Sequence, residues 1–148
     1  MVDMLEEVKA QITGEIKDLT QEQTDFLIDE QANSIGATIM HLAATEAYFQ
    51  VESLEGRMWT QEEAAYWGVG AALGDTSREK FKGKPIQHYL DIWDEVRQKT
   101  LEGLKEKDDA WFASDIDENM NFHWAWFHVL DHSANHMGQI ALVKKRLP

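Results

Sequence analysis

The segment NFHWAWFHVLDHSANHMGQIALVKKR, residues 121–146, decides the fold class of this chain. Its apolar residues recur at spacings of three and four and no proline interrupts them, which predicts one long amphipathic helix. The core-facing side of that helix is expected to carry Phe122, Trp126, Val129, Ser133, His136, Ile140 and Val143. The same spacing recurs upstream, and no strand-like alternation extends beyond a few residues. The sequence therefore predicts an all-α protein.

Three more long helices are expected upstream. The first covers residues 2–18 and is followed by a polar connection over residues 20–31. The second runs from Asn33-Ser34, two good N-cap residues, to about Gly56. The third begins at Pro85, which suits the first turn of a helix. Four long helices in 148 residues predict a four-helix bundle that forms a single domain over residues 1–148.

The second and third of these helices are separated by the least regular part of the chain, residues 57–84. Thr60 and Glu63 have the spacing of a capping box, which predicts a short helix over residues 61–67. The glycines that follow are expected to interrupt any longer helix. A connection of this length allows a long crossover between helices 2 and 3 of the bundle, and such long connections are usually functional or mobile.

Composition excludes several classes of function. Lys and Arg number 14 against 27 Asp and Glu, so the net charge is −13 and the surface repels nucleic acid phosphates. The absence of cysteine excludes disulfides, thiolate ligands and a Cys nucleophile. No stretch approaches the roughly 18 apolar residues of a membrane span. A cytoplasmic protein that contacts neither nucleic acid nor membrane is expected.

Histidine carries the strongest chemical signal. Four of the six histidines lie between His123 and His136, and residues four apart on a helix share one face about 6 Å apart. Two such imidazoles can bind one metal ion, although spacing alone does not choose between His128/His132 and His132/His136. His41, among small residues of the second expected helix, is a candidate third ligand. Burying these groups without a metal would cost several kcal/mol.

Two segments resemble the signatures of a known family. HVLDHSANHMGQI, residues 128–140, looks like the C-terminal signature of the DinB/YfiT-like superfamily, and SIGATIMHLAATE, residues 34–46, looks like its other signature. The resemblance implies a four-helix bundle that holds a divalent metal, Zn or Ni first and Fe or Mn next. The ligands it implies are His41, His132 and His136, with His128 and Gln139 supporting them from outside the coordination sphere.

Related bundles include transferases that use low-molecular-weight thiols such as bacillithiol or mycothiol. The resemblance therefore favours an enzyme, a metal-dependent thiol S-transferase acting on a small electrophile. The alternatives are a metal-dependent hydrolase, with Glu46 as the candidate catalytic acid or base, and a non-enzymatic metal-binding stress-response protein. Glu46 is equally explained as an interior carboxylate paired to a cation. Met137 stands where the family often has Arg, which leaves the substrate class open.

Two further expectations concern residues outside this site. Trp124 and Phe127 fall off the core-facing side of the last helix, which hints at a second buried surface and agrees with the homodimers common in the family. His88 and His123 have no partner at ligand spacing and are treated as ordinary residues.

Overall fold

The computed structural model describes residues 1–148 and is all-helical, which confirms the predicted all-α class. The long helices are α1 (Val2–Ile16), α3 (Ile35–Leu54), α6 (Ile86–Leu104) and α8 (Phe122–Lys144). The short helices are α2 (Gln21–Asp25), α4 (Gln61–Ala72), α5 (Gly74–Lys80) and α7 (Asp109–Ala113). None of them has the length and apolar character needed to cross a lipid bilayer.

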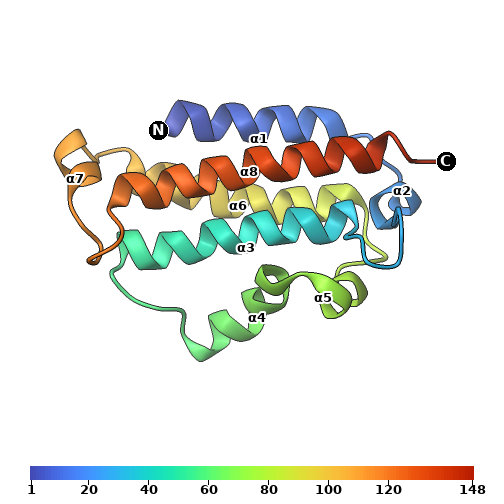
Figure 1. Ribbon diagram of the computed structural model, residues 1–148, viewed down its shortest axis with the longest axis horizontal. Coiled ribbons are helices and arrows are strands. Elements are labelled where there is room, and N and C mark those ends of the chain that lie inside the picture. Colours follow the sequence, from blue (N-terminus) through green and yellow to red (C-terminus); the bar gives the residue numbers. More distant parts are fainter.

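The four long helices lie side by side (Figure 1). Helix α3 packs against α6 and α8, and α1 closes the group through its contacts with α8 and α6. Helices α3 and α6 run in the same direction, opposite to α1 and α8 (Figure 1). The chain therefore has to return along the whole length of α3 before α6 begins, and α4 and α5 make that return on its outer side.

Side-chain caps fix where the helices that carry the histidines begin. The Ser34 hydroxyl accepts the Ala37 N–H at the start of α3, and the Asn121 side chain accepts the Trp124 N–H at the start of α8. These caps satisfy backbone donors that have no partner inside the helix. Thr60 and Glu63 form the predicted capping box of α4.

The connection differs from its prediction. Helix α4 continues to Ala72, through Gly68 and Gly70, because its packing against α3 outweighs the weak helix preference of glycine. Residues 74–80 form α5, and residues 21–25 form α2, which begins with its own capping box. Both segments were expected to be irregular.

The interior is mainly apolar, and among its buried polar groups is one ion pair with both partners almost fully enclosed. Glu46 on α3 and Arg97 on α6 expose 1% and 3% of their side chains, respectively. Arg97 Nε and Nη2 donate to the two carboxylate oxygens at 2.7 and 2.9 Å, and the indole of Trp93 and the hydroxyl of Thr100 donate at 3.0 and 2.6 Å. Arg97 also donates to the carbonyl of Leu5 on α1. One charged cluster thus connects three of the long helices.

Arg97→Met is expected to lower the free energy of unfolding by about 3–5 kcal/mol, because it leaves the Glu46 carboxylate buried without its cation. Urea denaturation of the wild type and the variant measures the loss. Arg57→Met, which removes a solvent-facing guanidinium paired with Glu55 and Glu63, is the control and should change stability little. Equal losses in the two variants would contradict a structural role for the buried pair.

Candidate metal centre

Three imidazoles from two helices meet at one point. His41 projects from the second turn of α3, and His132 and His136 project from successive turns of α8. The Nε2 atoms of His41 and His132 lie 3.0 Å apart, and those of His132 and His136 lie 3.2 Å apart. The structure therefore groups His41 with the pair His132/His136, the choice that spacing alone left open.

The spacing of these nitrogens fits a shared cation. Two nitrogens bound tetrahedrally to one ion, each about 2.0–2.1 Å from it, lie roughly 3.3 Å from each other. A neutral imidazole has one N–H, and His41 donates its own through Nδ1 to the carbonyl of Gly70 at 3.0 Å. The Nε2 of His41 therefore offers a lone pair. A single N–H on the Nε2 of His132 cannot point at both neighbours, whereas a cation satisfies all three nitrogens.

The environment of the three rings keeps them uncharged. Burial lowers the pKa of His41 and of His136, and burial together with the neighbouring imidazoles lowers the pKa of His132 to about 4. At neutral pH the three rings are therefore neutral. Metal binding then needs no net loss of a proton from them, provided that the single N–H of each ring lies on Nδ1.

Gly70 on α4 completes the environment of His41. A side chain at this position would place its Cβ 3.1 Å from the backbone oxygen of Met40, so the close approach of α4 to α3 depends on glycine. The carbonyl that this approach supplies fixes the tautomer of His41 and leaves Nε2 free. Sequence reasoning missed this residue, because its role exists only once α4 packs on α3.

The two residues expected to support the ligands lie beside the triad. The His128 ring stacks on that of His132, with centroids 5.7 Å apart, and on that of Trp124, with centroids 5.1 Å apart. The Gln139 side chain is exposed and donates to Asn135 at 3.0 Å. Neither residue is part of the cluster of His41, His132 and His136.

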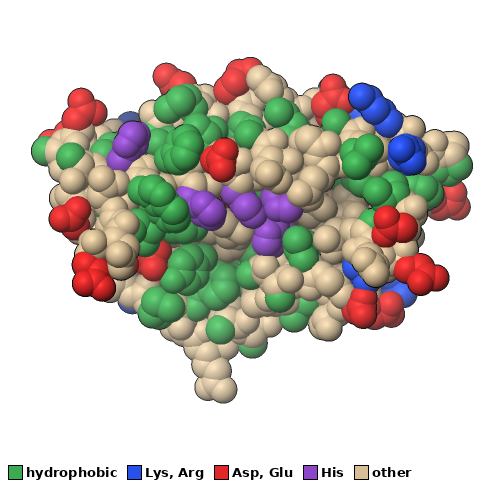
Figure 2. Space-filling view, viewed as in Figure 1, with side chains coloured by type: hydrophobic (Ala, Val, Ile, Leu, Met, Phe, Trp, Pro, Cys, Tyr) green, Lys and Arg blue, Asp and Glu red, His purple; other side chains and the backbone are tan.

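The remaining candidates lie elsewhere. Both oxygens of the Glu46 carboxylate are engaged in the buried ion pair with Arg97, and no carboxylate belongs to the histidine cluster. His88 and His123 are exposed and also lie outside the cluster. Figure 2 shows a row of histidine side chains at the centre of one face, reaching the surface and flanked on one side by hydrophobic side chains, with a further histidine apart from the row.

Comparison with known proteins gives one finding. A model of the family described as Mycothiol-S-transferase matches residues 1–147, which confirms the resemblance to the DinB-like superfamily. A search of curated proteins returned no match.

Gly70→Ala is expected to weaken the binding of added Zn²⁺ about threefold to tenfold, because it pushes the carbonyl away from His41. Gly68→Ala is the matched control on the same helix, since a Cβ there meets nothing within 4 Å. Competition with a chromophoric chelator measures both affinities. The same loss in both variants would contradict the assigned role of Gly70.

Proposed function

This chain belongs to the mycothiol-S-transferase family, and on that premise we propose that it is a divalent-metal-dependent enzyme that joins a low-molecular-weight thiol to a small electrophile. The observation that carries the proposal is the convergence of three uncharged imidazoles, with Nε2 atoms 3.0 and 3.2 Å apart. Three protein ligands leave a position open for a substrate, as in catalytic rather than structural sites.

We assign His41, His132 and His136 as the metal ligands. Three imidazoles suit Zn or Ni, and also Fe or Mn. Bound there, a divalent ion would lower the pKa of a thiol, so that the thiolate forms at neutral pH. The chain has no cysteine, so this sulfur has to arrive with the substrate. His128 would hold the ring of His132 in place by stacking on it, and Gln139 would border the site one turn beyond His136.

The chemical step forms one bond and breaks another. The thiol proton passes to water, and the sulfur uses its electron pair to form a C–S bond with the electrophile as the leaving group departs with its own pair. The contribution of the chain is to position the reacting sulfur between α3 and α8. The neutral histidines carry no positive charge that would compete with the cation they hold.

Thiol transfer agrees with this site better than hydrolysis does. A hydrolase would need an acid or base beside the triad, and Glu46 was the candidate. Its oxygens instead accept hydrogen bonds from Arg97, Trp93 and Thr100. We therefore assign Glu46 a structural role.

The proposal extends to architecture and assembly. We propose that the four long helices form the four-helix bundle of the family as one domain, with residues 55–85 as its crossover connection. We also propose a cytoplasmic homodimer. Trp124 and Phe127 on α8 leave 49% and 50% of their surface exposed, which supports a second protein surface there.

Metal content tests the ligand assignment. We expect wild-type protein purified from cells to hold about one divalent ion per chain, and His41→Ala and His136→Ala to lose nearly all of it. His123→Ala removes an exposed histidine from the same helix, α8, and should keep the ion. Elemental analysis measures all four proteins, and full metal retention in both ligand variants would refute the triad.

Thiol conjugation tests the reaction. With mycothiol and 1-chloro-2,4-dinitrobenzene, we expect metal-loaded wild type to release chloride, and His132→Ala to be slower by about 100-fold or more because it removes a ligand. His123→Ala should match the wild type. Unchanged activity in His132→Ala would contradict the proposal, and thiol-independent consumption of an ester substrate would indicate a hydrolase. If the wild type keeps its metal but catalyses neither thiol conjugation nor ester hydrolysis, it is a metal-binding protein without transferase activity.

A further inference from the structure

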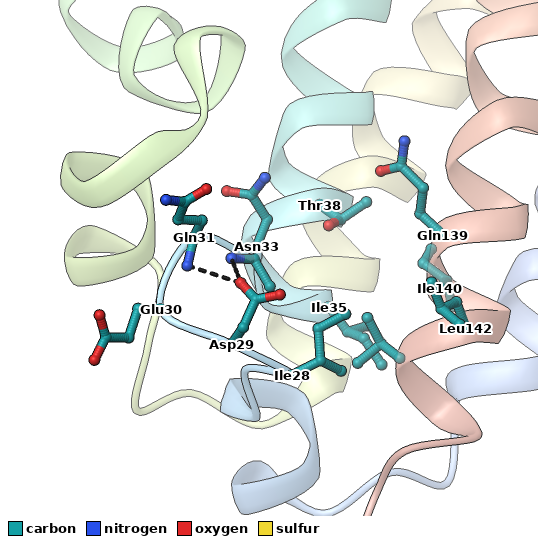
Figure 3. A pocket seen from close by; sticks show the side chains of 12 residues that line it. Ile28, Asp29, Glu30, Gln31, Asn33, Ile35, Thr38, Gln139, Ile140 and Leu142 are labelled. Carbon is teal, nitrogen blue, oxygen red and sulfur yellow. Dashed lines mark hydrogen bonds between the residues drawn. The ribbon is translucent and has the colours of Figure 1, made fainter.

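A cavity of about 620 Å³ begins one helical turn from the histidine triad. The loop of residues 28–33 forms one wall, and the last turns of α8 form the opposite wall (Figure 3). Its volume lies within the usual range of small-molecule sites. Apolar side chains such as Ile35 and Ile140 share its lining with amides and a hydroxyl.

The cavity and the triad share two helices. Thr38 lines the cavity three residues before His41 on α3, and Gln139 lines it three residues after His136 on α8. Residues three apart lie on the same helix face and are separated by about 4.5 Å along the axis. A molecule with one end at the triad can therefore extend its other end into the cavity.

The charge of the cavity has one sign. Asp29 and Glu30 are among its lining residues, and the lining contains no Lys, Arg or His. Both side chains are exposed; that of Asp29 lies on the side of the loop that faces Ile35, whereas that of Glu30 points away from the cavity (Figure 3). Asp29 is held in place because one carboxylate oxygen accepts the N–H groups of Gln31 and Ala32, both at 2.8 Å (Figure 3). The guanidinium nearest this loop belongs to Arg78, which donates to the carbonyls of Gln31 and Ala32 and pairs with Asp75.

The cavity also offers uncharged hydrogen-bonding groups. Thr38 is buried, and its hydroxyl donates to the Ser34 carbonyl, so its lone pairs remain available as acceptors. Gln139 donates to Asn135 and keeps its own carbonyl oxygen as an acceptor. Such groups bind amides and hydroxyls, whereas the carboxylate of Asp29 repels a carboxylate, sulfonate or phosphate, and Glu30 adds a more distant charge of the same sign.

We infer that this cavity binds the non-reacting end of the thiol substrate, and that the acidic loop, through Asp29 on its cavity side and the more distant charge of Glu30, selects an uncharged or cationic thiol over an anionic one. The inference rests on the proposed function, because it assumes that the sulfur lies at the triad. Asp29 is the specificity-determining residue here and takes no part in the bond-forming step.

A matched pair of thiols tests this selection. N-acetylcysteine and N-acetylcysteine amide differ only in that the first has a carboxylate where the second has a neutral amide. In protein loaded with Co²⁺, the absorption band of a cobalt–thiolate bond reports the dissociation constant of each thiol. We expect the wild type to bind the amide about tenfold more tightly than the acid, and Asp29→Asn/Glu30→Gln to reduce this preference at least about threefold.

The chain supplies a closely matched control. Asp117-Glu118 repeats the dipeptide Asp29-Glu30, and the Asp117 carboxylate likewise accepts a backbone N–H two residues ahead, from Asn119 at 2.7 Å. This loop precedes α8, at the opposite end of that helix from the cavity (Figure 1). Asp117→Asn/Glu118→Gln removes the same two charges and should leave the preference unchanged.

The possible results distinguish a failure of the cavity inference from a failure of the proposed function. A fall in preference confined to Asp29→Asn/Glu30→Gln supports the cavity as the thiol site. An equal preference in both double variants, with thiolate bands present, overturns this inference and leaves the proposed function standing. Absence of a thiolate band with either thiol overturns the proposed function and this inference with it.

Discussion

The convergence of three imidazole nitrogens on one point is the constraint on which the rest of this structure depends. It requires α3 and α8 to keep a fixed separation and rotation, since three side chains that could share one ion must be held to within about 0.5 Å. Core packing on the inner sides of both helices supplies part of this precision. The buried pair of Glu46 and Arg97 adds to it, because it anchors α3 to α6 and α1 five residues beyond His41.

The connection between α3 and α6 has a chemical role as well as a topological one. Because α3 and α6 run in the same direction, the chain must return along α3, and α4 lies on the face that carries His41. The carbonyl of Gly70 there sets the tautomer of His41. The same connection places Arg78 where it holds the loop of residues 28–33, one wall of the neighbouring cavity.

The sequence predicted the features that repeat at helical spacing, and it did not predict those that depend on the packing of one helix against another. The long helices were expected within a few residues of their observed ends, for example residues 2–18 for α1, because apolar periodicity and caps are local signals. The grouping of His41 with two histidines of α8 also followed from spacing and from the small residues around His41. The choice of His132/His136 over His128/His132 depends on how α8 is rotated about its axis. Helical spacing alone does not determine this rotation, and only the family resemblance pointed to His132/His136. The partner of Glu46 and the role of Gly70 could not be found, because Arg97 and His41 are brought to them only by the tertiary fold.

The separation of the three imidazoles along the chain has a consequence for how the site forms. His41 and His132 are 91 positions apart. Helix α3 is synthesised before α8, so in the nascent chain His41 stands without the two histidines that it meets in the folded protein. The three nitrogens converge only after α8 has been made and has docked on α3. A site of this kind is therefore assembled late, by a contact between distant parts of the chain.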